Sequence, residues 1–186
     1  MSKTFWDSST RHFPSQEELG ALDRDLAFRP APEKGVTLTP EQLQFYNREG
    51  YLLPFRVFDD AEIGVIRAHF DCWLDEVHRE GADSYSIVSA HIKHGVVWDI
   101  VRNERISRYV TDLLGNAFVC WGAHFFCKMP NDGKRVSWHQ DASYWPMSPS
   151  KTVTVWLAID DADRDNALSL IHISEPTRRT PISYAV

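Results

Sequence analysis

The pattern of apolar and polar residues predicts helices in the first two-thirds of the chain. One short helix is fully marked, because Thr39 caps it, Gln42 completes a capping box and Gly50 ends it. A long amphipathic helix begins at Asp59 or Asp60, since apolar residues then recur at spacings of three and four. The long helix therefore has one face for a core.

Two further helical segments are predicted on either side of these. In residues 96–116 the apolar side chains, Ile106 among them, recur at helical spacing, and Gly115 is expected to end the helix. A short helix around residues 17–26 interrupts a stretch of scattered charge and proline that shows little other periodicity. We interpret residues 1–36 as an N-terminal arm packed on the domain.

From Ala117 onward the helical spacing gives way to the composition of strands. The run AFVCWGAHFFCKM is rich in aromatic and β-branched residues, NDGK has the chemistry of a turn, and KTVTVWLAI alternates from Thr152. Helices first and strands afterwards indicate an α+β domain with an antiparallel barrel or sandwich.

Composition and charge narrow the class of partner. The 186 residues are 43% hydrophobic, as in one soluble domain, and 20 basic against 26 acidic side chains give a net charge of -6 without a like-charged block. A small-molecule partner is expected, with neither nucleic acid nor membrane. A signal-peptide core and an apolar run of roughly 20 residues are both missing, which favours a cytoplasmic protein. The oligomeric state is left open.

Cys72, Cys120 and Cys127 stand among apolar residues without metal-ligand or redox spacing. We expect buried, reduced thiols, because free cysteine is usually buried.

Two His-x-Asp triplets occur, and they make opposite predictions. His69 and Asp71 fall in the long amphipathic helix, where side chains two residues apart point about 200° away from each other and cannot share an ion. His139 and Asp141 follow the change to strand-like composition, so both can take one face of a strand. A hydrogen-bonded surface pair would look the same. With one distant His, however, the pair would complete the two-His, one-carboxylate site of Fe(II) oxygenases.

The run SWHQDASYWPMSPSKTVTVWLAIDDADRDNA, with GAHFFCKMPNDGK and LTPEQLQFYNREGYLL before it, closely resembles the phytanoyl-CoA dioxygenase family of Fe(II)- and 2-oxoglutarate-dependent oxygenases. The resemblance covers about residues 37–167. It implies a cupin-like double-stranded β-helix, or jelly roll, with flanking N-terminal helices. It also implies that O2 converts the co-substrate 2-oxoglutarate to succinate while an aliphatic C–H bond of a small organic substrate is hydroxylated.

The resemblance carries over to four positions of this sequence. His139 and Asp141 match the family's first two iron ligands. Trp156 matches an aromatic side chain that walls the 2-oxoglutarate pocket, and His124 falls where a preceding strand faces that pocket. A core tryptophan and a hydrogen-bonded core histidine are the alternatives. Because position 141 keeps its carboxylate, the site resembles the hydroxylases of the family rather than its halogenating members.

The family pattern also requires a distal His and an Arg that pairs with 2-oxoglutarate. His172 comes too soon after the ligand pair, since several strands of about 5–6 residues should intervene. Residues 168–186 instead resemble translated sequencing adapter, with LSLIHISEPTR and ISYAV on either side of its variable index. His172, Arg178 and Arg179 are therefore not assigned as ligands. We expect a domain that is incomplete at its C-terminus and an inactive fragment.

Two alternatives to the oxygenase remain. A non-catalytic jelly-roll module that binds a small molecule would be favoured if the native continuation lacked the distal His. A zinc or manganese cupin is disfavoured, because such sites usually gather more imidazoles around the first strand. The sequence does not distinguish an acyl-CoA substrate from a free acid, an amine or a natural-product scaffold.

Overall fold

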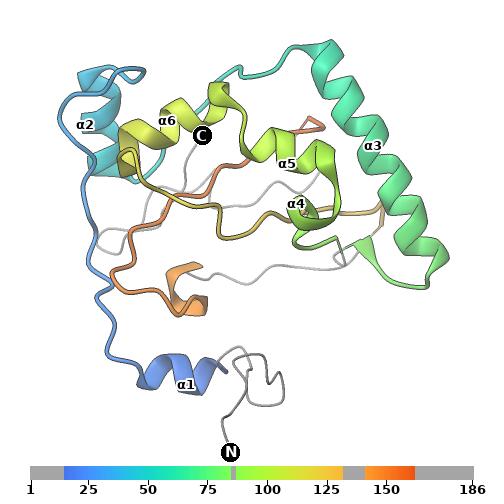
Figure 1. Cartoon of the computed structure of the whole chain (residues 1–186), viewed down its shortest axis with the longest axis horizontal. Helices are drawn as coiled ribbons and strands as arrows, with labels where there is room; N and C mark the ends of the chain where they lie inside the picture. Colours follow the sequence, from blue (N-terminus) through green and yellow to red (C-terminus); the bar gives the residue numbers. More distant parts are fainter. Residues whose placement is uncertain (1–14, 85–86, 132–140, 162–186) are drawn as a thin grey trace, which may run out of the picture.

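The computed structural model describes residues 15–84, 87–131 and 141–161. The helices are α1 Gln16–Ala21, α2 Pro40–Glu49, α3 Asp60–Arg79, α4 Ala90–Lys93, α5 Gly95–Val101, α6 Glu104–Leu114 and the 3-10 turn η3 Asp141–Tyr144. Figure 1 shows α2 and α6 at one end of the molecule and α3 and α4 at the other. Within the described ranges, no helix has the length and apolarity needed to cross a membrane.

The predicted helix ends of α2 and α3 are confirmed. Thr39 accepts a hydrogen bond from the backbone of Gln42, whose side chain bonds back to Thr39, and Gly50 ends α2 in the left-handed conformation with φ of 84°. Asp59 and Glu62 form the same reciprocal box at the start of α3. These side chains satisfy N–H groups that have no partner within the helix.

The other helices differ from prediction in extent. Residues 96–116 form two helices, because the Asn103 side chain accepts a hydrogen bond from Arg105 N and so caps α6 separately from α5. The predicted helix at residues 17–26 is shorter, since α1 already ends at Ala21. The stretch before α5, which shows no clear pattern in the sequence, contains the single turn of α4.

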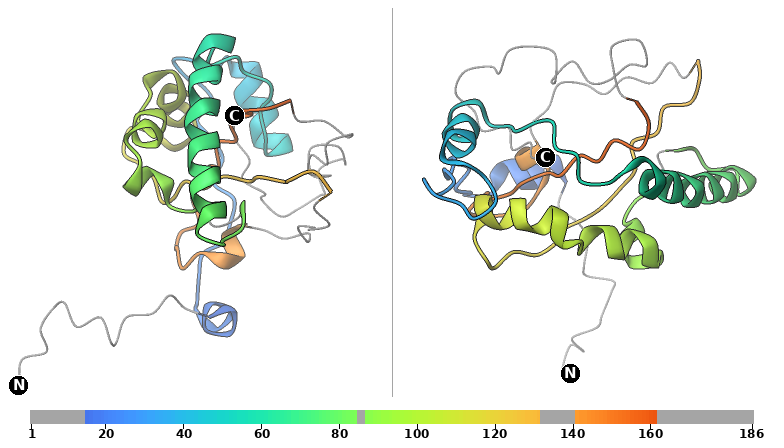
Figure 2. Two further views of the ribbon diagram at one scale, coloured as in Figure 1. Left: turned by 90° about the vertical axis from the view of Figure 1, so that its right-hand side faces the viewer. Right: turned by 90° about the horizontal axis from the view of Figure 1, so that it is seen from above.

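Two hydrophobic clusters form the core among the described residues, one at each end of the helical layer. The first cluster joins α2, α6 and the loops beside them through Ala31, Leu38, Leu43, Tyr46, Leu52 and Leu113. The second cluster joins α3, α4 and α5 through Phe70, Leu74, Ile87, Ala90 and Val97. Figure 2 shows the extended segment of residues 117–129 running along these helices.

The strand half of the predicted α+β fold is not confirmed. In the part of the chain that the structure describes, residues 117–129 and 151–158 are extended but form no continuous strand. An isolated antiparallel bridge pairs Val88 with His124, and Phe125 N donates to Ile87 O at 3.1 Å. A β-sheet requires neighbouring strands that pair over several residues. Residues 132–140 and 162–186 of the predicted strand region lie outside the described residues.

The expected burial of the cysteines is wrong. Cys72 and Cys120 are exposed, and Cys127 is half-buried against the second cluster. Cys72 lies on the solvent side of α3, whose buried positions are Ile66, Phe70 and Leu74. Apolar neighbours in the sequence therefore did not identify which helix face carries this thiol.

Candidate functional site

The candidate iron ligands are only partly described. His139 lies outside the described residues, whereas Asp141 is the first residue of the η3 turn and is half-buried. Thr154 Oγ1 donates a hydrogen bond to Asp141 Oδ2 at 3.5 Å, which is long for an O–H donor. A carboxylate has about four acceptor positions, so this contact is compatible with metal binding by Asp141.

Alternation along residues 151–158 puts two further side chains on the Asp141 side. Val153 packs against the first hydrophobic cluster, so its neighbour Thr154 points away from the helices. Trp156 lies two residues beyond Thr154, on the same face, and is 40% exposed. Asp141, Thr154 and Trp156 thus belong to one side of this extended segment.

The segment that carries His124 alternates in the same way. Ala123, Phe125 and Cys127 pack against the second cluster, whereas His124 and Phe126 are exposed on the opposite face. The His124 and Phe126 rings meet edge to face, with their centroids 4.8 Å apart. His124, like Trp156, therefore lies on a face turned away from the helices, and neither is a core residue in this structure.

Helices α3 and α6 hold the segment that follows η3. Lys151 Nζ donates to Leu114 O at 2.9 Å, at the carboxyl end of α6, where the helix dipole favours a cation. Arg67 of α3 forms ion pairs with Asp71 and with Asp160. The extended segment behind Asp141 is thus attached to both ends of the helical layer.

His69 and Asp71 of the first triplet make separate contacts, as the helix geometry predicts. The His69 ring stacks against Trp73 with centroids 5.9 Å apart, and the Trp73 ring also lies 4.3 Å from the His94 ring. Asp71 accepts from Arg67 Nε at 2.8 Å. This triplet therefore provides a matched negative control for the second one.

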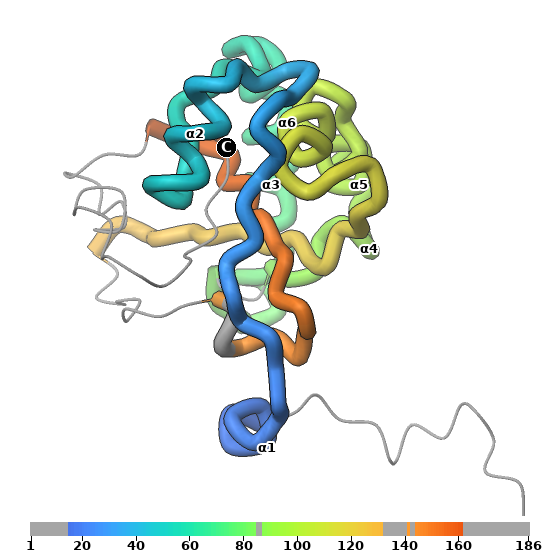
Figure 3. The backbone as a smooth tube through the Cα atoms, turned by 90° about the vertical axis from the view of Figure 1, so that its left-hand side faces the viewer, coloured from blue at the N-terminus to red at the C-terminus, as the bar shows by residue number. Residues whose placement is uncertain are grey.

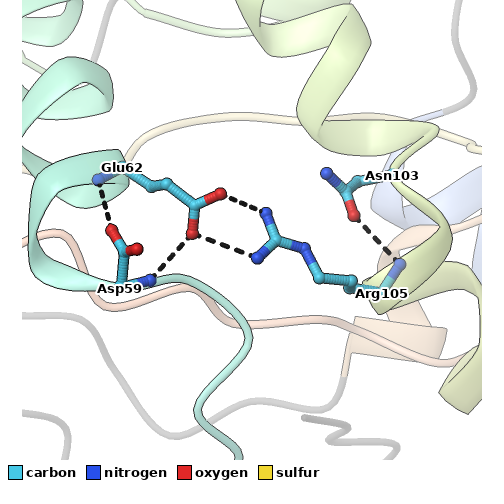
Figure 4. Close-up of polar contacts among 4 residues, drawn as sticks. All are labelled: Asp59, Glu62, Asn103 and Arg105. Atoms are coloured by element: carbon cyan, nitrogen blue, oxygen red, sulfur yellow. Dashed lines mark hydrogen bonds and ion pairs between the residues drawn. The ribbon is translucent and has the colours of Figure 1, made fainter.

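An ion pair joins the beginnings of α3 and α6 (Figure 4). Arg105 donates to both carboxylate oxygens of Glu62, at 3.0 and 2.5 Å, and its guanidinium lies 4.7 Å from the centre of the Phe58 ring. The hydrogen bonds from Arg105, then that from Asp59 N, hold the pKa of Glu62 below its usual range. Glu62 thus joins the beginning of α3 to the beginning of α6.

Sequence reasoning missed Asp112, a carboxylate of α6 that is only 6% exposed. It accepts three backbone N–H bonds, from Val36 at 3.0 Å and from Thr37 and Leu38 at 2.7 Å each. Burial raises the pKa of Asp112, but these three bonds together outweigh burial and lower it. The available signal was an acidic residue beside Leu113 on the apolar face of the last predicted helix.

A surface hollow of about 570 Å³ lies over α2 and is lined by Glu33, Lys34, Pro40, Gln44, Asn47 and Arg48. The predicted site residues do not line it. Within the described residues, no three His, Cys, Asp or Glu side chains come together as a metal site. Because His139 lies outside the described residues, the predicted ligand pair stays a prediction.

Comparison with known proteins identifies the class to which this chain belongs. Residues 46–174, more than half of the chain, match the model of the phytanoyl-CoA dioxygenase family. The chain is therefore a member of that family, whose cupin-like fold and dioxygenase activity agree at the family level with the sequence prediction.

Curated relatives are about one-quarter identical to this chain over the stretches that align. The ectoine dioxygenase of Bordetella bronchiseptica is 26% identical over 118 residues, which are 58% of this chain and 38% of that protein. The peroxisomal phytanoyl-CoA dioxygenases of Bos taurus and Rattus norvegicus are each 27% identical, over 72% of this chain and 46% of theirs. The chain thus spans less than half the length of these relatives. No solved structure matches significantly.

Proposed function

We propose that the complete protein is an Fe(II)- and 2-oxoglutarate-dependent dioxygenase that hydroxylates an aliphatic C–H bond of a small organic substrate. The observation that carries the proposal is the position of Asp141. This carboxylate lies within the stretch that matches the family, contacts Thr154, and shares one side of the extended segment with Trp156. The proposal includes a jelly roll built on the extended segments of residues 117–129 and 151–158.

The side-chain chemistry of Asp141 and His139 fits an iron centre. Asp141 supplies a half-buried carboxylate, and together with the imidazole of His139 it gives the mixed oxygen and nitrogen ligand set that Fe(II) oxygenases use. When bound, iron and 2-oxoglutarate supply the O2 activation that hydroxylation of an unactivated C–H bond requires. The protein contributes the positions of these groups and the exclusion of water.

Five residues of the chain have a defined part in this proposal. His139 and Asp141 hold the metal. Thr154 orients Asp141 through its hydroxyl, since hydrogen bonds from outside the ligand set direct a ligand toward the ion. Trp156 and His124 wall the 2-oxoglutarate pocket from two extended segments whose outer faces carry them.

The names of the relatives direct the choice of substrates to test. They are called ectoine dioxygenase and phytanoyl-CoA dioxygenase, so a zwitterionic small molecule and an acyl thioester are the two chemistries to assay first. We place the protein in the cytoplasm within this proposal, although two relatives are named peroxisomal. A tagged copy of the chain in its source cell would test that placement.

The metal assignment is tested by Mn²⁺ binding, because Mn²⁺ accepts oxygen and nitrogen ligands and does not react with O2 during the titration. We expect Asp141→Ala and His139→Ala each to remove measurable Mn²⁺ binding, followed by the electron paramagnetic resonance of free Mn²⁺. Asp71→Ala is the matched control, since Asp71 is engaged by Arg67 on α3. Equal Mn²⁺ affinity in Asp141→Ala and the parent chain would contradict the assignment.

The catalytic part of the proposal is tested on the full reading frame. The source locus is sequenced past the codon for Ala167, and we expect a distal His followed by an Arg. The product of that frame should then form succinate from 2-oxoglutarate in an Fe(II)-dependent reaction. A frame without the distal His, whose product binds a small molecule but forms no succinate, would favour the non-catalytic binding module instead.

A further inference from the structure

The N-terminal arm reaches the turn that carries Asp141. Helix α1 packs against η3, and its Leu19 is fully buried. Figure 3 shows the arm, in blue, passing beside the orange segment that begins at η3. More than a hundred residues separate the two segments in sequence, so their contact is a tertiary feature of the fold.

Three hydrogen bonds join the arm to the chain just after η3. Arg24 Nη1 donates to Trp145 O at 2.7 Å, Asp25 N donates to Ser148 Oγ at 2.9 Å, and Ser150 N donates to Asp25 O at 2.9 Å. Two of them use the backbone of Asp25, which accepts and donates as a strand neighbour would. Trp145, Ser148 and Ser150 are thereby fixed to residues 24 and 25 of the arm.

Local contacts within the arm hold Asp25 in this position. Its carboxylate accepts from Ala27 N at 3.0 Å and pairs with Arg29. The side chain is thus used inside the arm, which leaves the backbone N–H and C=O for Ser148 and Ser150. Arg24 is half-buried, and its planar guanidinium provides the contact closest in sequence to Asp141.

Asp141 is therefore held on two sides. Thr154 contacts the carboxylate directly, and the arm fixes the turn from which that carboxylate projects. Metal affinity depends on such supporting contacts, because a ligand that must be ordered during binding binds less tightly than one already in place.

We propose that residues 16–29 form a strap that positions Asp141 for metal binding, with Arg24 as the principal positioning residue through its bond to Trp145 O. This inference rests on the proposed function, because it takes Asp141 as a metal ligand. It assigns to the arm a role in the site, in addition to the packing that the sequence predicts.

The test compares Mn²⁺ affinity and amide hydrogen exchange in variants of the full chain. Arg24→Ala should raise the Kd for Mn²⁺ about tenfold. It should also speed exchange of residues 141–150 in the metal-free protein. Arg24→Lys keeps a donor for Trp145 O and should restore part of the affinity. Arg56→Ala is the matched control, because Arg56 forms an exposed pair with Asp60 and should change neither measurement.

Two further variants keep the test decisive if Arg24→Ala folds poorly. Ser148→Ala removes a single bond of the strap and should weaken Mn²⁺ binding in the same direction, by less than Arg24→Ala. Gly35→Ala strains the far end of the arm, where an added Cβ would meet Asp112, and should lower stability without changing Mn²⁺ affinity.

The outcomes separate the two proposals. If Asp141→Ala loses Mn²⁺ while Arg24→Ala and Ser148→Ala bind it like the parent, the strap is wrong and the metal assignment stands. If Gly35→Ala weakens binding as much as Arg24→Ala, the effect is one of general stability and the strap is also wrong. If Asp141→Ala binds Mn²⁺ like the parent, or the product of the full reading frame binds no Mn²⁺, the metal assignment fails and the strap with it.

Discussion

The N-terminal arm and the two residues that follow it are attached at two places, and the two attachments differ in kind. At residues 36–38 three backbone N–H groups meet the buried carboxylate of Asp112. At Arg24 and Asp25 the partners are neutral carbonyl and hydroxyl groups, and Asp25 is exposed. Hydrogen bonds in which the donor or the acceptor is ionised are about twice as strong as neutral ones, and this applies to all three bonds at Asp112 but only to the Arg24 bond at the other attachment. We expect the Asp112 end to open only with the whole fold and the Arg24 end to open locally.

Asp112→Ala tests the stronger attachment and should have the largest effect. It leaves three N–H groups without their acceptor in a buried setting, so the free energy of unfolding should fall by about 3 kcal/mol. Urea denaturation followed by circular dichroism measures this loss. Asp75→Ala, which removes an exposed carboxylate from α3, should change the midpoint little. A loss in Asp112→Ala no greater than in Asp75→Ala would refute the predicted difference between the two attachments.

Gly35→Ala strains the same attachment from the opposite side. An added Cβ would lie 2.5 Å from Asp112 Oδ2 and 3.1 Å from Leu38 O, so the short buried carboxylate would have to move. We expect a loss of about 2 kcal/mol in unfolding free energy. Gly64→Ala, in α3 with nothing within 4 Å of the new Cβ, should instead stabilise by up to about 1 kcal/mol. Equal midpoints for the two variants would show that Gly35 has room.

The charge of Asp112 also predicts a pH dependence. Its pKa is lowered from the ordinary value of 3.8, so the folded state binds this proton less readily than the unfolded state. The stabilisation is fully present above pH 3.8 and is lost as the pH falls through the lower folded pKa. The difference in urea midpoint between the parent and Asp112→Asn should therefore shrink between neutral pH and pH 3. A constant difference would mean that the charge does not contribute.

The smallest effect is expected at the ion pair between Glu62 and Arg105. Both side chains are about 40% exposed, at 39% and 42%, so water and salt screen their attraction. Arg105→Ala should lower the urea midpoint slightly, and a double-mutant cycle with Glu62→Gln should give a coupling that disappears in 1 M salt. A coupling unaffected by salt would indicate that the stacking of Arg105 on Phe58 is the more important contact.

The comparison of the two attachments also shows what the sequence could predict. Local signals such as the Thr39 and Gln42 capping box placed α2 correctly, because the interacting groups lie within one turn. The division between α5 and α6 was missed, since the apolar spacing continues across Asn103 while its side chain starts a new helix. The roles of Asp112 and Arg24 depend on partners far away in sequence, and no local pattern encodes such contacts.

The candidate site was predictable to the same limited degree. Geometry alone separated the first His-x-Asp triplet from the second, and the separate contacts of His69 and Asp71 confirm that argument. The link from Thr154 to Asp141 and the support from the arm required the tertiary structure. The identity of His139 as a ligand stays a prediction.

The alternation along residues 123–127 and 153–156 has a consequence for how this protein can change in length. In residues 123–127 odd positions contact the helices and even positions face the opposite side, and Val153 also contacts the helices, so one inserted or deleted residue would exchange the two sets from that point onward. Phe125 would then leave the second hydrophobic cluster, and His124 would enter it. A change of two residues would preserve both sets. Among natural variants of these segments, we therefore expect lengths to differ in steps of two.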